Sequence, residues 1–179
     1  MLPFSTIGEK FEDIARFGAV YALITLFFIL DVIPVPQPFD GLMAVPFLTI
    51  TVYYWAAYRP TLLPALAVFV LGLLLDIMGG TPIGLNAILL VLLHWAISDQ
   101  RAFLSAQSFL MVWLVFSVVS TGIIIVQWAI TGLVNLGWAS IALLWPQMLA
   151  GIVAYPILTI LLHLIHKILP SPKMPLTSR

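Results

Sequence analysis

Apolar residues gather into six long segments, separated by short stretches that contain charged residues, Pro or Gly. Segments of this kind predict membrane-spanning helices, for which about 20 apolar residues suffice. We therefore expect an all-α fold, a polytopic bundle of six transmembrane helices in a single domain over residues 1–168. The expected helices are about Ile14–Ile33, Leu42–Tyr58, Leu62–Ile77, Ile83–Ile97, Phe103–Leu133 and Ser140–Ile168.

Positive charge is distributed unevenly between alternate ends of these segments. The seven basic residues are Lys10, Arg16, Arg59, Arg101, Lys167, Lys173 and Arg179. The stretches 32–42, 79–86 and 132–142, at the other ends, contain none. Because basic residues stay on the cytoplasmic side during insertion, the pattern predicts cytoplasmic turns at Arg59 and Arg101. It also predicts that both termini are cytoplasmic. Residues 169–179 are rich in Pro, Ser and Lys, and this composition predicts a disordered tail.

Two segments have unusual lengths. Ile83–Ile97 has 15 residues, about 22 Å of helix, which is short for a hydrocarbon core of about 30 Å. A re-entrant hairpin is the alternative, but it would move Arg101 to the outer side and remove the charge asymmetry. We therefore expect a short full span with local thinning of the bilayer. Phe103–Leu133 is long, and its first turns are expected to follow the inner interface.

Composition agrees with a membrane protein and excludes several functions. The chain is 63% hydrophobic and 8% charged, whereas soluble domains have about 25% charged residues. A net charge of zero leaves no basic patch for nucleic acid. The absence of Cys excludes disulfides and thiolate chemistry.

Asp76 and the residues that follow it form the most distinctive stretch. Gly79 and Gly80 are suited to ending one helix, because Gly adopts positive φ without strain. Pro82 suits the first turn of the next helix, with Thr81 as its N-cap. We expect the Asp76 carboxylate to accept hydrogen bonds from backbone N–H groups of this turn, to contact a partner protein, or to lie at a solvated helix end.

The stretch Gly72–Ala87 resembles the signature of the rod shape-determining protein MreD family. The residues that carry the resemblance are Gly72, Asp76, Gly79, Gly80, Pro82 and Gly84. The resemblance implies a cell-shape component of the bacterial inner membrane that binds MreC and supports lateral peptidoglycan synthesis. It also implies a fold similar to the six-helix substrate-binding subunits of vitamin (ECF-type) transporters.

Two further sets of residues are candidates for binding. Small residues let helices approach closely in lipid, so they form either internal packing or a docking face for another protein's helix. These residues are Ala15, Gly18, Ala19, Ala22, Ala150 and Ala154. Polar residues in the outer halves of the helices are candidates for an outer polar pocket. They are Asp31, Asp76, Gln127 and Gln147.

No catalytic constellation is visible in the sequence, so we expect a non-enzymatic scaffold without metal or cofactor. His163 and His166 have a spacing that suits metal, but no acidic residue lies near them. A small-molecule-binding subunit of a vitamin or micronutrient transporter is the alternative, because the outer polar residues can line a pocket. A lipid flippase or lipid-processing enzyme is a third hypothesis, disfavoured by the small number of buried polar residues.

Overall fold

The computed structural model describes residues 7–33, 35–36, 42–43 and 45–168. These residues are mainly helical, with one antiparallel strand pair in which Val35 pairs with Met43 and Pro36 with Leu42. The elements are α1 (Ile7–Val32), β1 (Val35–Pro36), β2 (Leu42–Met43), α2 (Phe47–Tyr58), α3 (Ala65–Gly79), α4 (Leu85–Asp99), α5 (Arg101–Ser105), α6 (Phe109–Val134), η1 (Ile141–Leu143, a 3-10 helix) and α7 (Leu144–Ile168).

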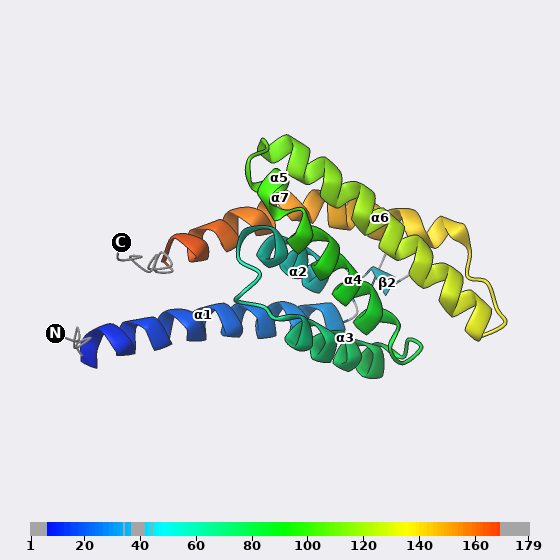
Figure 1. Cartoon of the computed structure of the whole chain (residues 1–179). Helices are drawn as coiled ribbons and strands as arrows, with labels where there is room; N and C mark the ends of the chain where they lie inside the picture. Colours follow the sequence, from blue (N-terminus) through cyan, green and yellow to red (C-terminus); the bar gives the residue numbers. More distant parts are fainter. Residues whose placement is uncertain (1–6, 34, 37–41, 44, 169–179) are drawn as a thin grey trace.

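Helices α1, α2, α3, α4, α6 and α7 run back and forth between two ends of the bundle (Figure 1). At one end α1 begins and α7 ends, and the α2–α3 connection with Arg59 and helix α5 with Arg101 lie there too. We call this the basic end. The strand pair, the α3–α4 turn and the α6–α7 connection lie at the other end, which we call the turn end.

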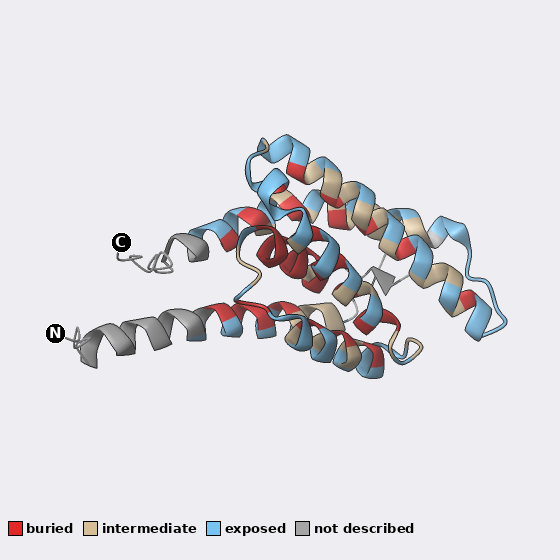
Figure 2. Cartoon of the chain, viewed as in Figure 1, coloured by how far each residue is buried: buried red, intermediate tan, exposed pale blue. Residues whose placement is uncertain are grey.

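Helix α2 lies at the centre of the bundle (Figure 2). It has 12 residues, and all ten from Leu48 to Ala57 are buried. Helices α1, α4, α5, α6 and α7 all contact it. Helix α2 is about 18 Å long, and its side chains pack against the other helices. By contrast, α6 and α7 carry many exposed apolar side chains.

Aromatic side chains join α2 to the two longest apolar helices. The ring of Tyr53 in α2 lies 5.2 Å from Phe116 in α6 and 5.8 Å from Tyr155 in α7, edge to face in both cases. The Tyr53 hydroxyl also donates to the carbonyl oxygen of Val112 at 2.9 Å. A buried phenol needs such a partner, so Tyr53 fixes the position of α2 relative to α6.

Several helix boundaries differ from the sequence-based expectation. A continuous helix over Phe103–Leu133 is wrong: α5 ends at Ser105 and α6 begins at Phe109. The backbone of Ser108 is extended, with φ −64° and ψ 154°, and this interrupts the helix. Ser105, Gln107 and Ser108 make this part of the sequence polar, but the interfacial first turns of one continuous helix explain them equally well.

The second and sixth expected helices also begin later. Leu42 belongs to strand β2, and α2 begins at Phe47, directly after a Pro that has no N–H to donate. Before α7, the chain makes the 3-10 turn η1, in which the Ser140 hydroxyl oxygen accepts from the Ala142 N–H at 3.3 Å.

Two described helices have both the length and the apolarity to cross a bilayer, namely α6 and residues Leu144–Leu164 of α7. Helices α3 and α4 are apolar but have 15 residues each, fewer than the roughly 20 of a full crossing. The six-span count and the likeness to transporter subunits therefore stay predictions. The expected tail, residues 169–179, lies outside the described residues.

Candidate functional site

The turn between α3 and α4 depends on two glycines with positive φ. Gly80 ends α3 in the left-handed conformation with φ +67°, as expected. Gly84, with φ +93°, precedes the first residue of α4. The expectation that Thr81 is the N-cap and that Pro82 lies in the first helical turn is wrong. Helix α4 begins three residues after Pro82, because a carboxylate from α3 takes over the role of the cap.

Asp76 supplies that carboxylate and is 1% exposed, so it is not a solvated helix end. One oxygen, Oδ2, accepts from the N–H groups of Gly84 at 2.9 Å and Ala87 at 3.4 Å. The other, Oδ1, accepts from the Thr81 hydroxyl at 2.7 Å and from the backbone and side-chain nitrogens of Asn86 at 3.0 and 2.8 Å. Unpaired N–H groups at a helix start favour an anion, so Asp76 ties α3 to the start of α4.

Gly72 allows the same two helices to touch at their backbones. A Cβ at this position would lie 2.5 Å from Cα and 2.7 Å from N of Ala87. By contrast, a Cβ at Gly79 would meet no atom within 4 Å. Among the small residues of the stretch, Gly72 is therefore required by close packing, and Gly80 and Gly84 by backbone conformation.

Asn86 extends the polar contacts of the turn to α6. Its side-chain nitrogen donates to Asp76 and to the Thr81 hydroxyl, and its amide oxygen accepts from Nε2 of Gln127. Sequence reasoning missed Asn86. The signal was present, because an amide at the start of an apolar helix needs buried partners. This contact joins Gln127 of α6 to the neighbouring helix α4.

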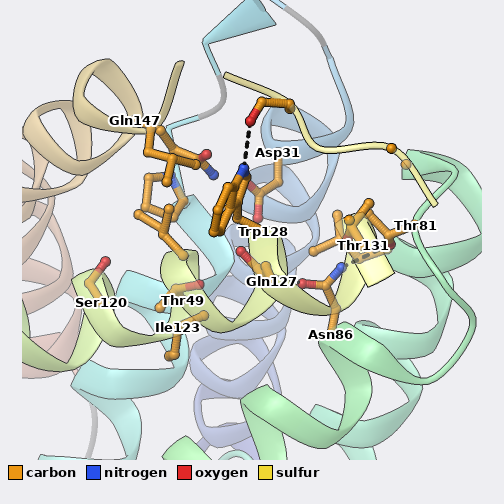
Figure 3. A pocket seen from close by; sticks show the side chains of 18 residues that line it. Asp31, Thr49, Thr81, Asn86, Ser120, Ile123, Gln127, Trp128, Thr131 and Gln147 are labelled. Atoms are coloured by element: carbon orange, nitrogen blue, oxygen red, sulfur yellow. Dashed lines mark hydrogen bonds between the residues drawn. The ribbon is translucent and has the colours of Figure 1, made fainter. Parts of the chain in front are cut away.

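A pocket of about 360 Å³, lined by both apolar and polar side chains, opens beside the turn, at the turn end of the bundle (Figure 3). Hydroxyl and amide side chains from α2, α4, α6 and α7 line it, together with one carboxylate from α1. The polar lining residues are Asp31, Thr49, Thr81, Asn86, Ser120, Gln127, Trp128, Thr131 and Gln147.

Three of the four residues expected in an outer pocket line this one, namely Asp31, Gln127 and Gln147. Asp76 does not line it, because its two oxygens are occupied by the turn. It lies one layer behind, bonded to Thr81 and Asn86, which do line the pocket. The pocket's role in binding remains a prediction.

Asp31 has a second role at the end of α1. Its Oδ2 accepts from the backbone N–H of Leu48 at 3.1 Å, in the first turn of α2. Two short helices, α2 and α4, thus begin at the turn end against a carboxylate from the preceding helix. The structure places Asp31 and Asp76 in equivalent local positions, which the sequence alone did not indicate.

The α6–α7 connection lies against one wall of the pocket. The indole N–H of Trp128 donates to the carbonyl oxygen of Ala139 at 2.9 Å, and both residues line the pocket. The ring of Trp138 lies 5.0 Å from that of Trp128 and against Gly132, where a Cβ would come within 2.7 Å. These contacts hold the connection at the pocket.

The small residues expected to dock other helices differ in exposure. Gly18 and Ala22 of α1 are exposed, whereas Ala150 and Ala154 of α7 are partly buried. Ala154 packs against the core. The side chains of Ala15 and Ala19 lie outside the described part of the structure. Internal packing therefore accounts for Ala154, while the face of α1 around Gly18 and Ala22 is uncovered.

No group of three or more His, Asp and Glu side chains that could hold a metal ion occurs among the described residues. The polar atoms at the turn end are carboxylate, amide and hydroxyl groups. Their arrangement suits hydrogen bonding to a ligand or to another protein.

Comparison with known proteins assigns the chain to a family. Residues 14–168 match the family of the rod shape-determining protein MreD. No curated protein and no solved structure shows a significant match to the chain. The match extends over the helices and the turn end, far beyond the stretch Gly72–Ala87, and the family is one of cell-shape proteins of the membrane. The chain, a membrane protein whose described residues include two helices of spanning length, therefore belongs to the rod shape-determining protein MreD family.

Proposed function

We propose that this protein is a non-enzymatic, multi-pass component of the bacterial cell-elongation machinery in the inner membrane. In this role it binds MreC and supports lateral peptidoglycan synthesis and rod shape. The observation that carries the proposal is the family match over residues 14–168. That match does not favour the alternative of a vitamin transporter subunit.

The arrangement of the helices supports a multi-pass topology with cytoplasmic termini. Arg59 and Arg101 lie at the basic end, together with the start of α1 and the end of α7 (Figure 1). Basic residues remain on the cytoplasmic side of membrane proteins. The basic end is therefore cytoplasmic in this proposal, and the turn end, with its pocket, faces the periplasm.

The exposed face of α1 is the surface proposed for MreC. Small residues permit close helix–helix contact in lipid, where van der Waals packing drives association. A Cβ at Gly18 would meet no atom within 4 Å, so nothing in the described structure covers this position. The proposed contact is a membrane-spanning helix of MreC packed along α1 at Gly18 and Ala22.

Co-purification from detergent and restoration of rod shape in a deletion strain test the proposal. We expect the intact protein to retain MreC and to restore rod shape. Gly18→Ile is expected to weaken MreC retention severalfold, because the added side chain holds the two helices apart. Gly122→Ile in α6 is the matched control, since a Cβ at Gly122 also meets no atom within 4 Å.

The possible outcomes distinguish a test of the proposed function from a test of the proposed docking surface on α1. Failure of the intact protein to retain MreC, or to restore rod shape, would refute the proposed function. Equal MreC retention by the Gly18→Ile and Gly122→Ile variants would leave the function in place and show that α1 is not the docking helix.

A further inference from the structure

The charge of the pocket at the turn end is unbalanced. Among the described residues that line it, Asp31 is the only acidic one, and none is Lys, Arg or His. The chain has no Lys or Arg between Arg16 and Arg59, or between Arg101 and Lys167. The segments that build the pocket therefore supply a carboxylate and no cation.

The negative charge of the Asp31 carboxylate is stabilised by fewer hydrogen bonds than that of Asp76. It accepts from the Leu48 N–H, and the adjacent Phe47 N–H adds a weaker interaction. Asp76 accepts five hydrogen bonds. A carboxylate away from bulk water is costly unless it is paired or fully hydrogen-bonded. The carboxylate of Asp76 is fully hydrogen-bonded within the turn, whereas the carboxylate of Asp31 can accept further hydrogen bonds from a partner outside the chain.

We propose that this pocket binds a primary ammonium group, with the Asp31 carboxylate as its counter-ion. The group is carried by a small organic amine or by the headgroup of an aminophospholipid. A ligand that carries only anionic groups is excluded, because no described lining residue carries positive charge. This inference goes beyond the proposed function and does not depend on it.

The size and lining of the pocket fit such a ligand. A volume of about 360 Å³ is at the lower end of the range of small-molecule sites, roughly 300–1,000 Å³. An ammonium group donates three hydrogen bonds. Besides Asp31, the side chains of Thr49 and Gln147 line the pocket and carry acceptor oxygens (Figure 3). The ring of Trp128 adds an aromatic face, to which cations are attracted.

A charge series on the unaltered full chain tests the ligand chemistry. The protein is placed in nanodiscs of phosphatidylglycerol and titrated with 1,4-diaminobutane, 1,4-butanediol or succinate, three probes of similar length. Tryptophan fluorescence reports binding because Trp128 lines the pocket. We expect a saturable change with the diamine and none with the diol or the diacid.

Asp31→Asn tests the counter-ion, since it keeps the shape and an acceptor for the Leu48 N–H. We expect diamine affinity to fall about tenfold or more, as for loss of a hydrogen bond to a charged group. Asp99→Asn is the matched control, because Asp99 is an exposed acid at the end of α4 and does not line the pocket. Its affinity is expected to equal that of the unaltered protein.

A lipid arm distinguishes the two sources of the ammonium group. Native mass spectrometry is carried out after release from nanodiscs of mixed phosphatidylethanolamine and phosphatidylglycerol. Retained phosphatidylethanolamine, lost in Asp31→Asn, identifies a headgroup site, whereas saturable binding of the diamine alone identifies a site for a soluble amine.

Three results would overturn the inference. They are absence of both the diamine response and phosphatidylethanolamine retention, an equal response to diol and diamine, and unchanged affinity in a folded Asp31→Asn variant. If that variant does not fold, the charge series on the unaltered protein decides the question by itself.

Discussion

Replacing Asp76 by Asn changes one oxygen of the carboxylate into an amino group and keeps the shape of the side chain. With its remaining oxygen at the Oδ1 position, the substituted side chain keeps the bonds from Thr81 and Asn86. Its amino group then faces two donors, the N–H groups of Gly84 and Ala87, which lie 2.9 and 3.4 Å from Oδ2 in the unaltered protein. The opposite orientation is worse, because it loses three bonds in place of two.

The expected magnitude follows from these two contacts. A hydrogen bond to a charged group contributes about 1.5–3 kcal/mol. The Gly84 bond has good length and is lost completely, while the Ala87 bond is long and contributes less. We therefore expect Asp76→Asn to lower the free energy of unfolding by about 2–4 kcal/mol.

Reversible unfolding in mixed micelles, followed by circular dichroism, measures this difference. Asp99→Asn removes an exposed acid at the far end of α4 and is expected to change stability by no more than about 0.5 kcal/mol. If the two variants unfold with equal free energy, the carboxylate does not hold the start of α4, and the account of the turn given above is wrong.

Three further substitutions have defined outcomes in the same unfolding assay. Gly72→Ala is expected to cost about 1–3 kcal/mol by overpacking against the α4 backbone. Gly122→Ala, inside α6 and with open space for its Cβ, is expected to stabilise the protein by about 0.4–1 kcal/mol, and equal effects would contradict the close contact at Gly72. Gly80→Val forces a branched side chain to φ +67° and is expected to cost at least about 1–2 kcal/mol, and an unchanged stability would show that the turn relaxes freely. Tyr53→Phe leaves the Val112 carbonyl without its side-chain donor and is expected to cost about 0.5–1.5 kcal/mol; no loss would mean that ring packing alone positions α2.

The local chemistry of the α3–α4 turn was accessible from the sequence. Gly80 at a helix end and an acid one turn before it left two interpretations of Asp76, a hydrogen-bonded turn or a solvated helix end, and the structure confirms the backbone hydrogen bonds to Asp76. The exact start of α4 could not be predicted from the sequence. Thr81 and Pro82 have the local preferences of a helix start, but the carboxylate of another helix overrides them.

Larger features depend on information that hydropathy does not carry. Lipid chains and protein interiors are equally apolar, so the segment Leu48–Ala57 looks the same whether it faces the bilayer or the other helices. The break at Ser108 was not predicted, because the polar residues beside it also suit the interfacial first turns of a continuous helix. The pocket was partly predictable, because the amides of Gln127 and Gln147 and the acid Asp31 are expensive in lipid and tend to meet.

The enclosure of α2 has a consequence for biogenesis. This helix leaves the ribosome before α7, yet part of its covering comes from α7. Until α7 docks, Tyr53 and its neighbours have no ring of Tyr155 to pack against. A nascent chain that stops before α7 thus exposes a segment that the finished protein hides, and this gives membrane quality-control proteases a direct way to recognise an incomplete copy.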